Sequence, residues 1–192
     1  WFNRGGFAKV QPYYARTGEL HALRDDVKPF IRTYFNSLAS LVNPEDLSMW
    51  EHFLNGAYNK THETGYFLHQ SRLMFARERD KELWLVPCIT DQWLRDGMSV
   101  AFGNAPTFFG TVNYSIRSHV ADGYVEAEVD VPQRKTPEIV VLRLRDPHGR
   151  ALATADVEGG TLDRIDAESH TVHIVPQAKH LHIRVDYAPG PP

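Results

Sequence analysis

The chain has 192 residues, of which 42% are hydrophobic and 23% are charged, which is the composition of an ordinary globular protein with one or two modest cores. Its formal net charge of −3, with Lys and Arg scattered along the chain, offers no basic surface to a phosphate backbone, so no nucleic acid is expected as a partner. No apolar run approaches the roughly 20 residues that a membrane helix requires, so no membrane is expected as a partner either.

The chain begins with Trp1, Phe2 and Asn3, without a Met and with two bulky aromatics. We interpret this as a fragment, or a processed piece, of a longer protein. An authentic terminus left by removal of a leader is the alternative. A secreted or periplasmic location is favoured over a cytoplasmic one.

The hydrophobic pattern is helical up to about residue 80. Apolar residues at three- and four-residue steps predict a helix over residues 25–42, where Pro29 suits the first turn and Pro44 ends the helix. The members of this stripe are Val27, Phe30, Ile31, Tyr34, Leu38, Leu41 and Val42. Similar spacing predicts a second helix over residues 64–77, before a charged run at 77–81, and a shorter helix over 19–24.

After residue 80 the hydrophobic period changes to two. Short segments rich in β-branched residues are separated by turn signals such as Asp122-Gly123 and Asp146-Pro147. The segments are residues 83–86, 98–102, 112–116, 124–129, 139–144, 171–175 and 181–185. They predict an antiparallel β-sandwich over residues 81–188, followed by a disordered tail at 189–192. One helical turn, capped by Thr90 or Asp91, is expected at residues 90–95.

The segment between the two longer helices, residues 48–66, carries most of the chemistry. It holds two Glu, two His, a Lys and several aromatics just before a helix, which is typical of the rim of a polar pocket. A turn signal at residues 55–57 separates Glu51 from Glu63, so we expect both carboxylates, with His52 and His62, at one cleft wall. Glycoside cleavage needs such a pair, because one carboxyl must stay protonated while the other stays ionised.

The catalytic candidates are Glu51, Glu63 and His62, and the substrate-binding candidates are Trp50, His52, Asn55, Tyr58 and Lys60. Aromatic rings suit stacking against a pyranose face, a His suits orienting a carboxylate or a sugar hydroxyl, and a Lys suits a uronic carboxylate. Each type also has a structural alternative, since aromatics are often core and a Lys is often solvated. Glu63 is also placed to interact with a helix dipole, with Thr61 as the N-cap.

The sequence indicates no metal and no cofactor. His62-Glu63 does not continue to a zinc-binding His-Glu-x-x-His motif, because position 66 is Tyr66. Cys88 has no Cys-x-x-Cys partner and is expected to be a packed thiol. Four histidines near the end favour an exposed His-rich edge over a chelating site; they are His170, His173, His180 and His182.

Two groups of motifs resemble parts of a known class of proteins. Residues 24–39, Trp50-Glu51-His52-Phe53, and Lys60-Thr61-His62-Glu63 with a following Phe-Leu-x-Gln-x-Arg helix resemble the last part of the (α/α)6 toroid of bacterial six-hairpin glycosidase-like proteins. Residues 82–85, 93–97 and 104–110 are similar to the β-sandwich that closes many of these proteins. The resemblance implies an α+β multidomain protein in which residues 1–80 are the end of a toroid. The rest of the catalytic region would then lie on the same precursor or on another chain, and the fragment alone is expected to be inactive.

Three functions remain open, all with an oligo- or polysaccharide as the partner. The first is a glycoside hydrolase, in which one carboxylic acid protonates the glycosidic oxygen and the other carboxylate activates water or attacks directly. The second is a polysaccharide lyase, in which a Tyr or His removes the proton beside a uronate carboxylate that an Asn, Arg or His neutralises. Its candidate residues are Tyr58, Asn55, His52 and His62. The third is a non-catalytic module that binds or supports glycan.

Overall fold

The computed structural model describes residues 16–49 and 61–190 of the chain. The chain divides into two compact units, Trp1–Met74 and Phe75–Pro192. None of the described helices combines the length and the apolar character that crossing a membrane requires.

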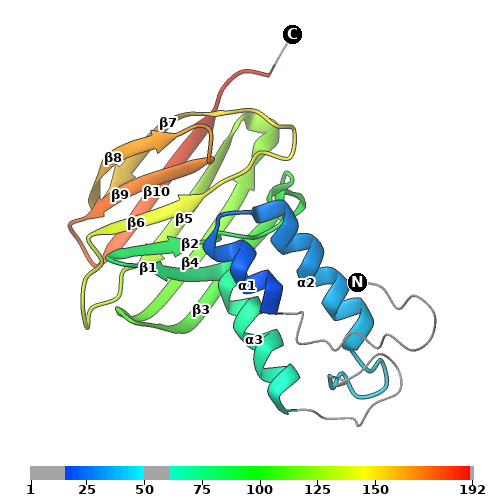
Figure 1. Ribbon diagram of the computed structural model, residues 1–192. Coiled ribbons are helices and arrows are strands. Elements are labelled where there is room, and N and C mark those ends of the chain that lie inside the picture. Colours follow the sequence, from blue (N-terminus) through cyan, green and yellow to red (C-terminus); the bar gives the residue numbers. More distant parts are fainter. Residues whose placement is uncertain (1–15, 50–60, 191–192) are drawn as a thin grey trace. The chain divides into compact units, whose positions relative to one another are not determined.

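The described part of the first unit contains three α-helices (Figure 1). They are α1 (Arg16–Leu23), α2 (Val27–Leu41) and α3 (Thr61–Phe75), of which the last residue, Phe75, already belongs to the second unit. The apolar stripe predicted over residues 25–42 is α2, with Phe30 fully buried. The helix ends at Leu41 because Val42 is extended, and its N–H still bonds to the carbonyl of Leu38.

Tyr34 joins α2 to α3. Its hydroxyl lies 2.9 Å from Oγ of Ser71, and its ring stacks on that of Phe67 with the centroids 5.8 Å apart. Burial raises the pKa of Tyr34, and the hydrogen bond with Ser71 offsets part of that rise. The two helices are therefore joined by a specific polar and aromatic contact.

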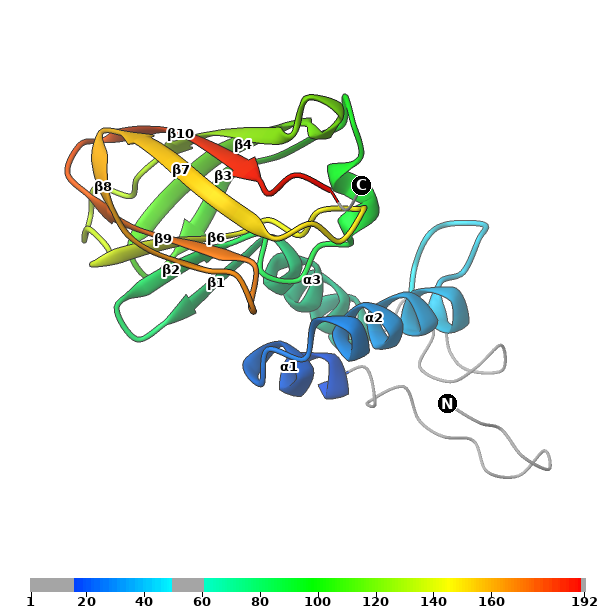
Figure 2. The ribbon, with the colours of Figure 1, turned by 90° about the horizontal axis from the view of Figure 1, so that it is seen from above.

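The second unit consists of two five-stranded sheets that lie in two layers (Figure 2). One sheet has the order β1-β2-β6-β9-β8, with β1 (Ala76–Arg79), β2 (Glu82–Leu85), β6 (Ile139–Arg143), β9 (Thr171–Pro176) and β8 (Gly160–Asp166). The other has the order β3-β4-β5-β10-β7, with β3 (Ser99–Thr107), β4 (Gly110–His119), β5 (Tyr124–Asp130), β10 (His180–Tyr187) and β7 (Leu152–Glu158). Two short 3-10 helices, η2 (Asp91–Leu94) and η3 (Val120–Asp122), complete the described elements of this unit.

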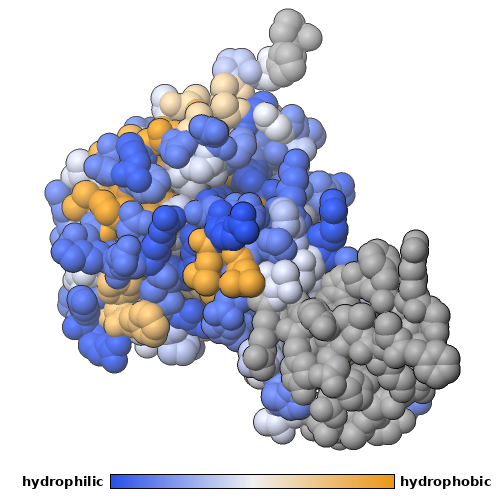
Figure 3. All heavy atoms as spheres, viewed as in Figure 1, coloured by the Kyte–Doolittle hydropathy of each residue, from blue (hydrophilic) through white to orange (hydrophobic). Residues whose placement is uncertain are grey.

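The core of the second unit lies between the sheets, and the alternation along each strand builds it. Every second residue is buried on β4, β5 and β10, whereas the residues between them face outward. The inward residues of these strands are Val112, Tyr114, Ile116, Ser118, Val125, Ala127, Val129, Leu181, Ile183, Val185 and Tyr187. On the face seen in Figure 3, hydrophilic side chains cover most of the second unit, with smaller hydrophobic areas between them.

The predicted order of helices followed by strands is confirmed, and the fold is α+β. The described residues contain three α-helices, so no toroid is seen in them. The expectation of a purely antiparallel sandwich is wrong at one place, because β2 and β6 pair in parallel. Between β2 and β6 the chain forms β3, β4 and β5 of the other sheet. It then returns to the first sheet as β6, which runs in the same direction as β2.

Three strands were not predicted: β1, β7 and β8. The charged residues 77–81 were expected to end a helix, yet α3 ends at Phe75 and Ala76–Arg79 form β1. Arg77 lies opposite Trp84 of β2 and its guanidinium sits 4.9 Å from the indole centroid, so a cation–π contact compensates for the burial of this charged residue. β7 and β8 contain several Asp, Ala and Thr residues and few large apolar ones, and their hydrophobic alternation is correspondingly weak.

Two local expectations are confirmed. The helical turn near residues 90–95 is η2, and the hydroxyl of Thr90 accepts a hydrogen bond from the N–H of Gln92 at 3.3 Å, so Thr90 is the cap. Cys88 is fully buried, as expected for a packed thiol.

Candidate functional site

The site residues expected from the sequence fall into two groups. Six of them lie outside the described residues: Trp50, Glu51, His52, Asn55, Tyr58 and Lys60. The other two, His62 and Glu63, lie in the first turn of α3. The convergence of Glu51 on Glu63 therefore stays a prediction.

Glu63 is a buried carboxylate. Its side chain is 1% exposed, and its Oε1 lies 3.3 Å from Nε2 of His62, whose side chain is 40% exposed. The first turn of a helix favours a negative charge, because unpaired N–H groups and the helix dipole point there. His62 thus connects a buried carboxylate with solvent, and the contact offers a path along which a proton can pass between the two groups.

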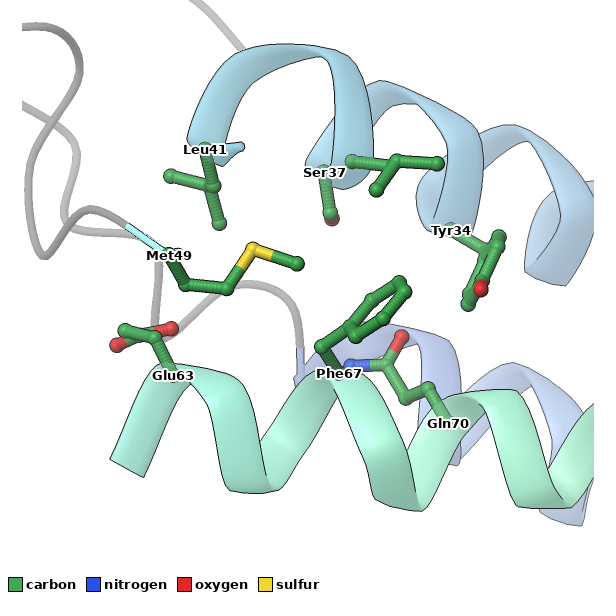
Figure 4. Close-up of a pocket in the computed structure, with 8 residues that line it drawn as sticks. Tyr34, Ser37, Leu41, Met49, Glu63, Phe67 and Gln70 are labelled. Carbon is green, nitrogen blue, oxygen red and sulfur yellow. The ribbon is translucent and has the colours of Figure 1, made fainter. Parts of the chain in front are cut away.

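The carboxylate of Glu63 lies at one end of a small cavity between α2 and α3 (Figure 4). The residues that line it are Tyr34, Ser37, Leu38, Leu41, Met49, Glu63, Phe67 and Gln70. Figure 4 shows Glu63 beside Met49, with Phe67 between the carboxylate and the amide of Gln70. The volume open to a water-sized sphere is about 10 Å³, which is about the room that one water molecule needs.

Gln70 is the second buried polar group of this cavity. It is 2% exposed, and its Oε1 has no hydrogen-bond partner among the described residues. A Cβ atom at Gly18 of α1 would lie 2.4 Å from this oxygen, so the glycine lets α1 approach the amide closely. Ser37 is already satisfied, because its hydroxyl donates to the carbonyl of Thr33 at 2.7 Å.

The sequence reading found Glu63 but missed Gln70 as its neighbour on the same face. Residues 63, 67 and 70 are spaced by four and three, which places Glu63, Phe67 and Gln70 on one side of α3. That spacing was available in the sequence. The approach of Tyr34 and Met49 was not, because it depends on how α2 and the following turn pack on α3.

The four histidines near the end of the chain do not gather at one place. His173 is on β9 and is 3% exposed, and burial, followed by the charge of Arg164, lowers its pKa. His180 and His182 are on β10 and both contact Glu128 of β5, with Nε2 to oxygen distances of 2.6 and 3.6 Å. Within residues 16–49 and 61–190, no group of three or more His, Cys, Asp or Glu side chains is placed to hold a metal ion.

Comparison with known proteins adds no assignment. No protein-family model matches the chain, and no curated protein matches it.

Proposed function

We propose that the chain is part of a carbohydrate-active enzyme of the six-hairpin glycosidase class, most simply a glycoside hydrolase. In this proposal the first unit is the end of an (α/α)6 toroid, and the second unit is the β-sandwich that follows it. The order of the two units along the chain supports this reading, as do the motifs on α2 and α3. The substrate would be an oligo- or polysaccharide, and the rest of the catalytic region would lie on the same precursor or on another chain.

The observation that carries the proposal is the buried carboxylate of Glu63 beside His62 at the start of α3. In the proposed reaction Glu63 would be the general acid, which gives its proton to the leaving oxygen of the glycosidic bond. Met49, Leu41 and Phe67 line the cavity beside its carboxyl group. Glu51 would be the second carboxylate, either as the base that activates water or as the nucleophile.

A second candidate is a non-catalytic module that supports or binds glycan. The size of the cavity favours it, because a space of about 10 Å³ admits a water molecule and not a sugar ring. In that case Glu63 stabilises the start of α3 through the helix dipole and takes no part in chemistry. Residues 50–60, which carry the other candidates, would have to form the remaining wall of a substrate cleft for the hydrolase proposal to hold.

The experiment measures cleavage of a panel of polysaccharides by the longest polypeptide that the reading frame encodes. New reducing ends without absorbance of an unsaturated sugar indicate a hydrolase, whereas an ultraviolet-absorbing product indicates the lyase alternative. Glu63→Gln should abolish most of the turnover. Glu45→Gln is the matched control, because Glu45 is an exposed residue of the same unit. Turnover that is equal in both variants supports the non-catalytic role of Glu63.

A further inference from the structure

We propose that His173 is a pH switch, which keeps the hairpin β8–β9 in the sheet β1-β2-β6-β9-β8 above about pH 6.5 and releases it when the imidazole takes up a proton. β8 is an edge strand of this sheet, and among the described strands β6 is the only partner that β9 has besides β8 (Figure 1). The pairing of β9 with β6 runs from Thr171 to Ile174, and His173 lies inside it, opposite Val141. One buried side chain can therefore decide whether the hairpin stays in place.

The imidazole of His173 is buried beside an indole. Only 3% of His173 is exposed, and its ring meets that of Trp84 edge-on, with the centroids 6.0 Å apart. The two residues belong to one row across the sheet, because Trp84 pairs with Val141 and Val141 pairs with His173. A neutral imidazole suits this place, since it packs on the indole as another aromatic ring would.

The ring of His173 has one hydrogen-bond partner among the described residues. Nε2 lies 3.0 Å from Oγ1 of Thr171, which in turn lies 2.8 Å from Oγ of Ser169, whereas Nδ1 has no partner among these residues. A neutral imidazole has a single N–H, but an imidazolium has one on each ring nitrogen. Protonation would thus leave a buried, charged donor at Nδ1 without an acceptor, and such a group is costly to bury.

Three arginines lie close to this site. The guanidinium groups of Arg77 on β1 and Arg143 on β6 lie 4.9 and 5.0 Å from the centroid of Trp84. Arg164 of β8 is paired with His173 across the hairpin. A proton on His173 would therefore add a positive charge to a region that already holds three.

Three carboxylates also affect the charge of His173, and each of them is engaged by another group. They are Glu82, which accepts from Nε1 of Trp84 at 2.7 Å, Asp163, which pairs with Arg164 at 2.9 Å, and Asp166, which accepts from the N–H of Ser169 at 3.1 Å. Burial, followed by the charge of Arg164, lowers the pKa of His173, although these carboxylates oppose the shift. The imidazole is thus neutral at a pH at which an exposed histidine is already protonated.

Acid should weaken this part of the sheet. Because the pKa of His173 is lowered in the folded state, its contribution to stability is fully present above the unfolded pKa of about 6.5 and is lost as the pH falls through the folded pKa. Opening of the hairpin returns His173 to the ordinary pKa. A proton that only the open form takes up favours opening by about tenfold at one pH unit below that value.

The other sheet responds in the opposite sense. His180 of β10 lies between two carboxylates of β5, with Nδ1 3.0 Å from Oδ1 of Asp130 and Nε2 2.6 Å from Oε2 of Glu128. The hydrogen bond with Asp130, followed by that with Glu128, raises the pKa of His180. Its contribution to stability is therefore present in mild acid and is lost as the pH rises. Acid should thus loosen β8 and β9 but not β10, which provides an internal reference.

The test is hydrogen exchange of the 192-residue chain, measured on its peptides by mass spectrometry and corrected for the intrinsic pH dependence of amide exchange. The background is His170→Asn, because burial also lowers the pKa of His170, in the turn before β9. In this background the peptides of β8 and β9 should exchange about tenfold faster at about pH 5.5 than at about pH 7.5, whereas those of β10 should show no such increase.

The decisive variant is His173→Phe, which keeps an aromatic ring beside Trp84 but cannot take up a proton. In the same background it should abolish the acid effect on β8 and β9. His182→Phe is the matched control, because it makes the same replacement on β10 at a side chain that is 39% exposed, and it should leave the acid effect intact. An equal acid effect with and without His173→Phe would overturn the inference, and so would an equal effect on the β10 peptides.

A second measurement does not depend on the folding of any variant. In an NMR titration of the wild-type chain, the ring of His173 should remain mostly neutral at about pH 6.5, and the indole N–H signal of Trp84 should change when this ring is protonated. A ring of His173 that is half protonated at or above about pH 6.5 would overturn the inference. Exchange of β8 and β9 that does not accelerate in acid in the wild type would do so as well.

Discussion

Arg150 donates from Nε to Oδ2 of Asp146 across 2.9 Å, and the side chain of Asp146 has no exposed surface. A second nitrogen of the same guanidinium lies 3.1 Å from Oδ1, so the contact is bidentate. Arg150 also donates to the carbonyl of Val120 at 2.9 Å, which ties the turn after β6 to the residues of η3. This pair therefore fixes two connections of the second unit at once.

We predict that Asp146→Asn lowers the free energy of unfolding by about 1.5–3 kcal/mol, because hydrogen bonds to charged groups contribute about that much. Asp163→Asn is the control, since the pair of Asp163 with Arg164 has the same 2.9 Å distance but is largely exposed. The control should change the free energy by less than about 0.5 kcal/mol. Chemical denaturation measures both values. Equal effects of the two substitutions would show that burial of the Asp146 pair adds nothing.

The same pair predicts a pH dependence. Burial opposes the ionisation of Asp146, but the hydrogen bonds from Arg150 outweigh it and hold the pKa of Asp146 below its ordinary value. A lowered pKa in the folded state contributes stability that is present above the unfolded pKa of about 3.9 and is lost as the pH falls through the folded pKa. The difference in unfolding free energy between the wild type and Asp146→Asn should thus shrink below about pH 4. A difference that stays constant down to pH 2 would contradict this assignment.

A close approach of backbone at Gly159 gives a third prediction. Gly159, between β7 and β8, has φ 81°, and a Cβ atom there would lie 2.2 Å from the carbonyl oxygen of His180. Gly149 has φ 78°, but its Cβ atom would meet nothing within 4 Å. Gly149→Ala should therefore cost about 1–2 kcal/mol for its backbone conformation alone. Gly159→Ala should cost about 1–3 kcal/mol more, because the backbone must also move. Similar unfolding midpoints for the two variants would contradict the clash.

The first unit exposes apolar side chains on two of its helices. Leu20 and Leu23 of α1 are 59% and 58% exposed, and Leu68 of α3 is 61% exposed. If these faces pack on further helices, as the proposed toroid requires, the 192-residue chain alone should associate with itself. Sedimentation velocity should show oligomers, and the combined replacement of the three leucines by Gln should shift them toward monomer. Phe108→Gln, at an exposed position of the second unit, should not. A monodisperse wild-type monomer would contradict the prediction.

The hydrophobic period predicted those parts of the fold in which local spacing decides the structure. Phe30, Tyr34 and Leu41 recur at helical steps, and α2 lies where they predict. The stripe Val125, Ala127 and Val129 likewise predicts a half-buried strand. The parallel pairing of β2 with β6 could not be predicted in this way, because alternation along a strand is the same for parallel and antiparallel partners.

Tertiary contacts explain what the sequence reading missed. Arg77 is charged, yet it is 3% exposed on β1 because Trp84 on the neighbouring strand offers its ring face. In the candidate site, too, local spacing reveals some features and tertiary contacts decide others. Glu63 and Gln70 share a helix face that their spacing reveals, whereas the size of the cavity beside them depends on Tyr34 and Met49, which come from other parts of the chain.

We propose that Glu51 and Glu63 act together on a glycosidic bond. The most direct measurement is turnover of the longest encoded polypeptide on polysaccharides, for the wild type, Glu51→Gln, Glu63→Gln and the double variant. Each single variant should lose a factor of about 10²–10⁴, and the double variant should lose little more, because residues that act as one unit are not additive. If both single variants keep wild-type turnover, the segment is structural and the claim is wrong.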